Sequence, residues 1–286
     1  MKNLYFLFIL AIFSAGFSQI PASSEKMVSQ ALAQKNQLAK NSLVKNFPLK
    51  NIGPSVMSGR VADLEVNPQD PTEFYVGYAA GGLWYTRNNG TSFVPVMDNA
   101  ATQNIGDIAV DWKNGTLWVG TGENISSRSS YAGIGMLKST DKGETWQDMG
   151  LNDGHHFGRI IINPNKPDEV VVGVTGHLYS PNEERGIFKT TDGGKTWQKT
   201  LYINDVTGII DIAHAPENFN IMYAAAWEKD RKAWNFTGNG NSSGIYKSTD
   251  AGTSWTKIST PESGFPTGEG VGRIGFAVYD ENTVYA

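Results

Sequence analysis

One short motif recurs along the chain, and few folds are built from such a repeat. Its form is Ser/Thr-x-Asp-x-Gly-x-Thr/Ser-Trp, and full copies lie within residues 138–146, 189–197 and 247–255. Residues 86–93 form a weaker first copy, with Asn88 in place of the Asp and Phe93 in place of the Trp. The copies recur roughly every 50 residues, which is typical of one blade of a β-propeller.

The residue types of the motif suit a tight turn between two antiparallel strands. Asp and Ser/Thr side chains accept hydrogen bonds from nearby backbone N–H groups, and Gly adopts positive φ without strain. The aromatic residue starts the next strand, where its ring can be buried between neighbouring blades. The turn resembles the Asp-box, or bacterial neuraminidase repeat, and its Asp residues are expected to shape turns rather than to bind metal or catalyse. The predicted structural positions are Asn88, Phe93, Asp141, Gly143, Trp146, Asp192, Gly194, Trp197, Asp250, Gly252 and Trp255.

We predict an all-β fold, a β-propeller of four-stranded antiparallel blades with Asp-box turns. Strand and turn signals divide residues 47–286 into four full blades and part of a fifth. The 32 glycines agree with many tight turns. Because a propeller closes only when its last blade meets its first, we expect residues 47–286 to be a propeller that is incomplete at its C-terminus.

The N-terminal residues have the pattern of an export signal. Lys2 precedes an apolar run from Leu4 to Phe13, and small residues follow. Residues 1–18 are therefore predicted to be a signal peptide, so the mature protein is expected to be secreted, periplasmic or at the cell surface. Residues 19–46 are predicted to be a poorly anchored helical lead-in. No later segment resembles a membrane helix, so no membrane span is expected.

Composition excludes several classes of function. The chain has no Cys, which rules out disulfides, thiolate metal sites and a cysteine nucleophile. The formal net charge is −4, and the lead-in is basic, so the propeller itself is acidic. Because an acidic surface repels phosphates, no nucleic-acid partner is expected. The oligomeric state is left unpredicted.

The lengths of the connections indicate which face of the propeller binds ligands. In a four-stranded meander, the second-to-third connections and the connections between blades lie on one face. Here these connections are long and varied, and include residues 123–132, 176–184 and 227–243. Because binding residues concentrate in variable loops on a rigid scaffold, this long-loop face is the predicted ligand-binding face.

Arginine, histidine and tryptophan residues are the candidates for ligand contact. Gly-Arg pairs at the starts of inner strands are expected to bring Arg60, Arg159 and Arg273 to the mouth of the central channel, where they suit carboxylate or phosphate ligands. The same arginines also suit ion pairs with carboxylates at blade edges, and aromatic residues also serve to pin a long loop. The full predicted set is Arg60, Arg128, His155, His156, Arg159, His177, Arg185, Trp227, Arg231, Trp234 and Arg273.

Neither a metal site nor a cofactor is expected. His155 and His156 are adjacent, so on a strand their side chains would point to opposite faces. No carboxylate accompanies them at a recognised metal-ligand spacing.

The whole set of motifs resembles large exported bacterial proteins with sortilin-type, neuraminidase-repeat propellers. The resemblance rests on the Asp-boxes, on residues 120–123 and 176–186, and on the Gly-Arg strand starts, and it covers about residues 47–286. Such proteins are often labelled glycosyl hydrolases without a known substrate. The resemblance therefore implies the propeller fold and leaves the activity open.

Two enzyme families share the repeat, and neither pattern is complete here. The resemblance to sialidases implies an arginine triad, but their Arg-Ile-Pro signature is absent because Ile161 follows Arg159-Ile160. Xyloglucanase-type propellers carry an Asp before a Gly-Gly pair in the first blade, and Ala79 stands at the similar point.

A glycosidase also needs two carboxyl groups roughly 5–10 Å apart. Asp107 and Glu123 belong to the second predicted blade and are kept as the candidate acid/base pair. We predict an exported β-propeller binding module that recognises a polysaccharide or peptide through its long-loop face. The alternatives are a glycoside hydrolase using these carboxylates and a sortilin-like protein-interaction propeller.

Overall fold

The computed structural model describes residues 23–47 and 59–286, so the predicted signal peptide lies outside the described residues. The one helix of more than one turn in that range is α2 (Glu25–Asn41), which begins after the N-cap residue Ser24. The Ser24 side chain accepts a hydrogen bond from the N–H of Met27 (3.4 Å). All of α2 is described and none of its residues is buried.

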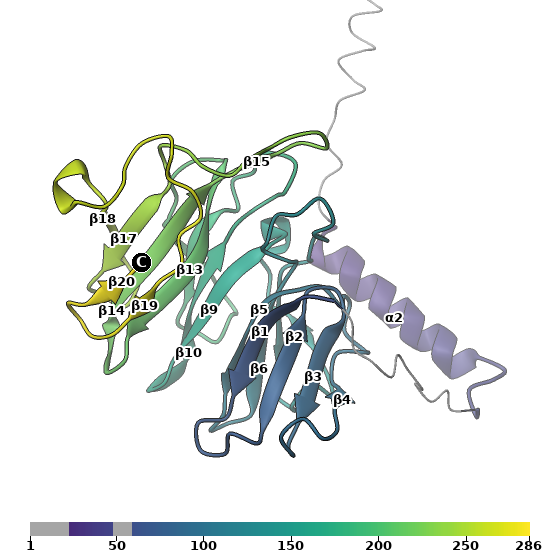
Figure 1. Ribbon diagram of the computed structural model, residues 1–286. Helices are drawn as coiled ribbons and strands as arrows, with labels where there is room; N and C mark the ends of the chain where they lie inside the picture. The colour runs from purple at the N-terminus through teal and green to yellow at the C-terminus, as the bar shows by residue number, and fades with distance from the viewer. Residues whose placement is uncertain (1–22, 48–58) are drawn as a thin grey trace, which may run out of the picture.

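The remaining chain forms antiparallel sheets that follow one another in sequence, which confirms the predicted all-β blades (Figure 1). Three sheets are plain meanders: β1 (Val61–Val66), β2 (Phe74–Tyr78), β3 (Gly82–Thr86) and β4 (Val94–Pro95); β5 (Ile105–Asp111), β6 (Thr116–Thr121), β7 (Met136–Ser139) and β8 (Gln147–Asp148); β9 (Phe157–Asn163), β10 (Lys166–Val174), β11 (Gly186–Thr190) and β12 (Gln198–Leu201).

The fourth sheet carries an insertion. It consists of β13 (Thr207–Ala215), β14 (Asn218–Glu228), β17 (Gly244–Ser248) and β18 (Thr256–Lys257). A hairpin of β15 (Asp230–Arg231) and β16 (Phe236–Thr237) is inserted between β14 and β17. A fifth sheet is represented by β19 (Ala277–Val278) and β20 (Val284–Tyr285), and single 3-10 turns lie at Asn152–Gly154 and Pro261–Ser263.

The hydrophobic core lies between neighbouring blades. Tyr75 and Leu83 of the first sheet pack with Ile105 of the second, and Trp118 of the second packs with Phe157 of the third. Two further clusters join the third sheet to the fourth and the fourth to the fifth. Each fully buried Val, Leu or Ile contributes about 1.5–3 kcal/mol, so adjacent blades stabilise one another.

The Asp-box turns share one geometry. In the second sheet, Ser139 Oγ donates to Asp141 Oδ1 (2.7 Å) and accepts from the N–H of Gly143 (2.8 Å). Asp141 Oδ1 also accepts from the N–H of Thr145 (2.9 Å), and hydrogen bonds from Thr145 lower the pKa of Asp141 to about 2. The other three copies make the corresponding bonds, the first through Asn88. The turns are therefore closed by their own side chains.

Each full Asp-box also bonds to the previous blade through its Trp. The indole Nε1 of Trp146 donates to the carbonyl of Val96 (3.0 Å), and that of Trp197 donates to the carbonyl of Met149 (2.7 Å). Trp255 Nε1 contacts Thr200 Oγ1 (3.3 Å) in the same way. The tryptophan therefore joins its turn to the outer strand of the preceding blade.

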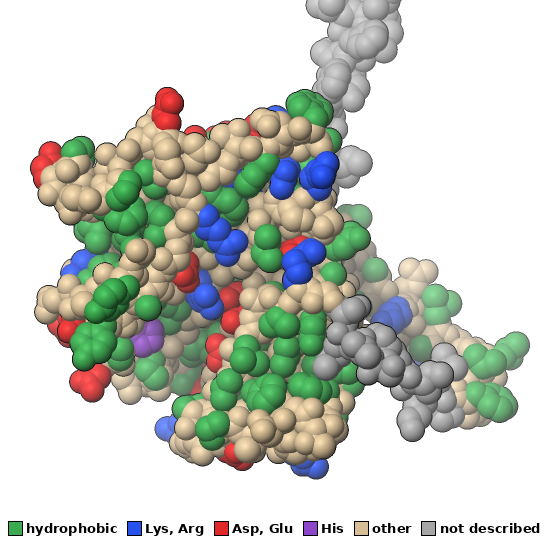
Figure 2. Space-filling model, viewed as in Figure 1, with side chains coloured by type: hydrophobic (Ala, Val, Ile, Leu, Met, Phe, Trp, Pro, Cys, Tyr) green, Lys and Arg blue, Asp and Glu red, His purple; other side chains and the backbone are tan. Residues whose placement is uncertain are grey.

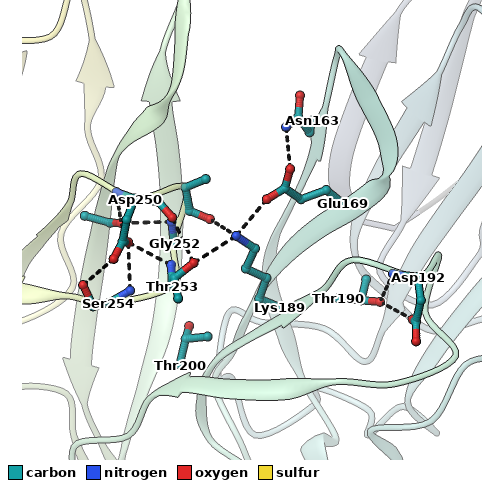
Figure 3. Close-up of polar contacts among 12 residues, drawn as sticks. Asn163, Glu169, Lys189, Thr190, Asp192, Thr200, Asp250, Gly252, Thr253 and Ser254 are labelled. Carbon is teal, nitrogen blue, oxygen red and sulfur yellow. Dashed lines mark hydrogen bonds and ion pairs between the residues drawn. The ribbon is translucent and has the colours of Figure 1, made fainter.

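The lysine that opens the motif bonds to the following blade. Lys138 Nζ donates to the carbonyl of Gly193 (3.0 Å), and Lys189 Nζ donates to the carbonyl of Ala251 (2.8 Å), the residue at the same place in the next turn. Figure 3 shows Lys189 reaching across to this turn while also contacting Glu169 of its own sheet (2.7 Å). Successive Asp-boxes are thus linked from blade to blade.

Candidate functional site

Three long loops meet on the face opposite the Asp-boxes. They are residues 122–135 after β6, 175–185 after β10 and 229–243 after β14. Arg231 donates from Nε and Nη2 to the carbonyl of Ser126 (3.0 and 2.8 Å). Tyr179 donates its hydroxyl to the carbonyl of Arg128 (3.1 Å). The loops of the second, third and fourth sheets therefore support one another as a single surface.

A groove of about 760 Å³ lies between the second-blade loop and the β15–β16 hairpin, and we call it the loop groove. The Trp234 side chain is 85 % exposed at its edge, and Phe236 is 38 % exposed. The guanidinium of Arg231 lies 4.2 Å from the Phe236 ring centroid, so a cation covers one face of that ring. The lining residues are Ser127, Arg128, Ser129, Arg231, Ala233, Trp234, Asn235 and Phe236.

Trp227 does not belong to this groove. It is 3 % exposed, and its Nε1 donates to the carbonyl of Gly238 (2.8 Å). Its ring packs edge-on against Phe236 (6.1 Å) and lies 5.7 Å from the guanidinium of Arg273. Trp227 and Arg273 therefore support the base of the hairpin, whereas Trp234 is the exposed aromatic surface.

The inner strands present a ring of charged residues. Its members differ from those predicted by aligning the Gly-Arg pairs at the starts of the strands. The inner strand of each four-stranded sheet has a β-bulge, and the residue directly after the bulge is Asp63, Asp107, Arg159 or Asp211. Arg60, aligned with Asp107 in the sequence, lies three residues before the equivalent position of the first blade. The ring therefore holds three aspartates and one arginine (Figure 2 shows charged side chains in the hollow between the sheets).

The aspartates of this ring bond to the neighbouring inner strand. Asp107 Oδ2 accepts from the N–H of Ile160 (2.6 Å), and Asp63 Oδ2 accepts from the N–H of Ile108 (3.2 Å). Asp211 makes the same kind of contact with the N–H of residue 276 (3.4 Å). The third blade has Arg159 at this position, which leaves its guanidinium free to contact the other three members.

Arg159 lies among the three carboxylates. It is 3.2 Å from Asp107, 3.1 Å from Asp211 and 3.7 Å from Asp63. The Asp107 carboxylate, followed by Asp211 and Asp63, raises the pKa of Arg159. Burial raises the pKa of Asp107 well above its usual range, although Arg159 acts in the opposite direction. Arg159 and Asp211 of this cluster line a cavity of about 440 Å³ together with Glu65.

Glu123, the other candidate catalytic carboxylate, forms an ion pair with Arg60. Both carboxylate oxygens accept hydrogen bonds from this guanidinium, and the Glu123 side chain is 1 % exposed. The hydrogen bond to Glu123 raises the pKa of Arg60. Asp107 and Glu123 are thus each held by a different arginine, and neither lines the loop groove.

Arg185 and His156 are buried within the loop scaffold. Arg185 donates to Asn182 Oδ1 (2.8 Å) and to the carbonyls of Thr175 (2.7 Å) and His177 (2.8 Å), and burial lowers its pKa to about 10. His156 Nδ1 lies 2.8 Å from the carbonyl of Glu123, and burial lowers its pKa to about 3. These contacts fold the loops and leave both residues away from solvent.

His155 and His177 come together from different loops. Their rings stack at 3.8 Å, and His177 Nε2 lies 3.0 Å from Asp153 Oδ1. Burial lowers the pKa of His155 to about 4, so this ring is neutral at pH 7. Asp153 is not among the predicted site residues, because its partner His177 is 24 residues away in the chain.

Sequence reasoning also missed Asp63 and Asp211, although a signal was present. Each lies in a Val/Ile-x-Asp-Leu/Ile stretch, as Asp107 does, and Arg159 occupies the same place between Gly158 and Ile160. Aligning the blades on this stretch, rather than on Gly-Arg pairs, would have identified the four-residue ring.

Within the described ranges, no helix is long and apolar enough to cross a membrane.

Comparisons with known proteins agree with the fold. Residues 135–265 match the family model Sortilin-Vps10, described as "Sortilin, neurotensin receptor 3". A xyloglucanase of Paenibacillus sp. is 25 % identical over 256 residues, covering 78 % of this chain and 23 % of that enzyme. A vacuolar protein sorting/targeting protein 10 of Laccaria bicolor is 24 % identical over 151 residues, covering 41 % of this chain and 10 % of that protein.

Solved structures give the same picture. The crystal structure of an ancestral GH74 enzyme superposes with a TM-score of 0.54 at 20 % identity, covering 73 % of this chain and 26 % of that one. The GH74 enzyme of Niastella koreensis superposes with a TM-score of 0.50 at 19 % identity, covering 68 % and 28 %. The chain therefore spans less than a third of the length of these relatives. The matches confirm the resemblance to Asp-box β-propellers.

Proposed function

We propose that this Asp-box β-propeller, related to xyloglucanases and Vps10 proteins, binds a polysaccharide in the loop groove. The observation that carries the proposal is the Trp234 side chain, which is 85 % exposed beside a groove lined by polar groups. An exposed indole offers a flat apolar surface for the face of a sugar ring, and neighbouring polar groups satisfy its hydroxyls.

The charge of the groove also favours a neutral or anionic chain. Arg128 and Arg231 are its charged lining residues, and Arg231 is already engaged with the Ser126 carbonyl and the Phe236 ring. Arg128 is exposed and supplies donors to hydroxyl or carboxylate groups. The sequence similarity to a xyloglucanase makes a plant-type β-glucan the first polysaccharide to test.

A glycoside hydrolase is the second candidate, favoured by that same similarity. Its carboxylates would be Asp107 and Glu123, which in this structure pair with Arg159 and Arg60. These ion pairs occupy the carboxylate oxygens that a general acid or nucleophile must offer to substrate. Binding without turnover is therefore the primary proposal.

Export completes the proposal. Residues 1–18 act as a signal peptide, which delivers the protein to the compartment where polysaccharides are met. N-terminal sequencing of the secreted protein tests this step, with a start near residue 19 as the expected result. Retention of an intact Met1 on exported protein contradicts it.

Affinity electrophoresis in gels containing xyloglucan, other β-glucans or pectin tests the binding proposal. Retardation in at least one gel is expected, and Trp234→Ala should raise Kd at least tenfold, equivalent to about 1.4 kcal/mol. Tyr279→Ala is the matched control, because Tyr279 is 72 % exposed and does not line the groove.

The outcomes separate the candidate functions. Equal retardation of the Trp234→Ala variant, or none in any gel, contradicts the groove as a polysaccharide site, and capture of a peptide ligand instead supports the sortilin-like alternative. Release of reducing sugar that Glu123→Gln abolishes, with melting temperature and binding retained, establishes the hydrolase.

A further inference from the structure

Asp153, His155 and His177 form a cluster that the binding proposal does not use. One ligand atom from each lies within 4.8 Å of the others, and no other group of three His, Cys, Asp or Glu residues in the described ranges does so. Asp153 lies in the 3-10 turn Asn152–Gly154 before β9, whereas His177 follows β10. Two connections of the third blade therefore converge on one point.

The backbone at this point is held in an uncommon conformation. His155 has φ 54° and ψ −39°, outside the regions that non-glycine residues favour. Its carbonyl accepts from the N–H of Gly133 (2.7 Å), and the Cβ that any other residue would place at position 122 would lie 1.8 Å from the same oxygen. Strained residues of this kind persist where the surroundings fix them, and they concentrate at functional sites. The conformation holds the His155 ring against His177.

Hydrogen bonds also fix the two loops relative to each other. Asn182 Nδ2 donates to the carbonyl of Asp153 (2.7 Å), while Asn182 Oδ1 accepts from the N–H of His177 (2.9 Å). His177 Nδ1 lies 2.9 Å from Ser180 Oγ. A partner on the second ring nitrogen orients a metal-binding histidine and sets which nitrogen faces the metal. The outer contacts of a metal site are therefore present.

The geometry points to a divalent transition-metal site: we propose that Asp153, His155 and His177 bind Zn²⁺ or a closely related ion. Imidazole nitrogen with carboxylate oxygen suits Zn²⁺, and tetrahedral bonds of about 2.0–2.1 Å place ligand atoms about 3.3 Å apart. His177 Nε2 and Asp153 Oδ1 are already 3.0 Å apart. A ring nitrogen of His155 lies within 4.8 Å of a ligand atom of each of the other two residues, so a rotation of the His155 side chain would complete the set.

A cavity adjoins the His155–His177 side of the cluster. A hollow of about 300 Å³ adjoins the cluster and is lined by His155, His177, Tyr131 and Tyr179 among others. The Asp153 side chain is 47 % exposed, so an ion reaches the cluster from solvent. Three protein ligands with one open position are the arrangement of zinc sites that hold a water or an exchangeable ligand.

Calorimetric titration of the full chain, freed of any histidine tag, with ZnCl₂ tests the proposal. One Zn²⁺ per chain is expected, with a rise in melting temperature because the ion binds only the folded state. Co²⁺ should give the absorption of a site with nitrogen and oxygen ligands. Absence of both saturable heat and melting shift in the wild-type protein overturns the proposal.

Variants locate the ion. Because loss of an outer-contact residue alone weakens metal binding about 10–100-fold, Asp153→Asn and His155→Ala should each weaken Zn²⁺ binding at least 100-fold. Asp153→Asn keeps the size of the side chain, and its apo melting temperature checks that the fold is intact. His214→Ala is the matched control, because His214 packs against Phe219 outside the cluster. Wild-type affinity in both cluster variants places the ion elsewhere and refutes the site.

Discussion

Replacing Lys189 with Met removes the charge at the centre of one link between blades. The ammonium contacts the carbonyl of Ala251 (2.8 Å), Thr253 Oγ1 (3.1 Å) and Glu169 Oε1 (2.7 Å), and Figure 3 labels the last two of these partners. The Lys189 and Glu169 side chains are 9 % and 12 % exposed. Water is therefore poorly placed to replace the lost partner.

The expected loss in free energy of unfolding follows from the contacts that Glu169 keeps. Removing one member of a buried ion pair costs about 3–5 kcal/mol, because the other charge stays buried without compensation. Glu169 keeps one hydrogen bond from Asn163 Nδ2 (2.7 Å) and retains slight exposure, so we expect the lower end, about 3 kcal/mol. Adding Glu169→Gln should recover about 1–2 kcal/mol of this loss, as coupled neighbours do.

The loss should also depend on pH. Burial raises the pKa of Glu169, but hydrogen bonds from Lys189 and Asn163 outweigh it, so the pKa in the folded protein is lowered. A lowered carboxyl pKa stabilises above the unfolded value and is lost as pH falls through the folded value. Without Lys189 this contribution disappears, so the deficit of the variant should be smaller in acid than at neutral pH.

Urea unfolding followed by tryptophan fluorescence measures these changes, since Trp197 and Trp255 lie at blade interfaces. The control is Lys195→Met, the same substitution at an exposed position of the same turn, which should change the free energy of unfolding by less than about 0.5 kcal/mol. If Lys189→Met stays within about 1 kcal/mol of this control, the reasoning about buried charge between blades fails.

Three further changes test other parts of the structure. Asp141→Asn should flatten the acid dependence of stability, because hydrogen bonds from Thr145 lower the Asp141 pKa to about 2. In the wild-type protein the stabilisation by this carboxylate is lost as pH falls from about 4 to 2, and acid titration of both proteins by circular dichroism measures that loss. Glu65→Gln should change the pH dependence of stability at higher pH, since burial, followed by a neighbouring carboxylate, raises the Glu65 pKa to about 8. Wild-type stability should therefore fall as pH rises from about 4.5 to 8. The same fall in the variant would contradict the raised pKa of Glu65. Gly194→Ala should destabilise the fold by about 2 kcal/mol or more, because φ is +93° and a Cβ would lie 2.7 Å from Trp118. Gly150→Ala is the control for backbone strain alone, because φ is +81° and no atom lies within 4 Å of the added Cβ. Equal melting temperatures of the two variants would exclude the clash with Trp118.

The blades were predictable because their signals are local. An Asp-box is closed by residues within five positions of one another, as Asp141 and Thr145 show, so its turn can be recognised from a short stretch of sequence. The alternation of strands and turns then gives the sheets in order. The order of strands and turns can therefore be predicted without knowledge of any distant contact.

The candidate site depends on contacts between blades, which a single sequence does not display. Glu123 is paired by Arg60, 63 residues earlier, and Arg231 reaches Ser126, 105 residues away. Trp227 and Trp234 lie in one aromatic loop, yet the first is buried and the second is exposed. Only the β15–β16 hairpin, set against the second-blade loop, decides which ring faces solvent.

The links between successive Asp-boxes also bear on how the protein folds. The bonds that these lysines and tryptophans make to another blade reach the adjacent blade, so the Asp-box side of the sheets approximates an array with nearest-neighbour coupling. Folding of such an array can nucleate in any adjoining pair of blades and propagate in both directions. Amide exchange should accordingly be slow in the second, third and fourth sheets, each of which packs against a sheet on both sides, and faster in α2, none of whose residues is buried.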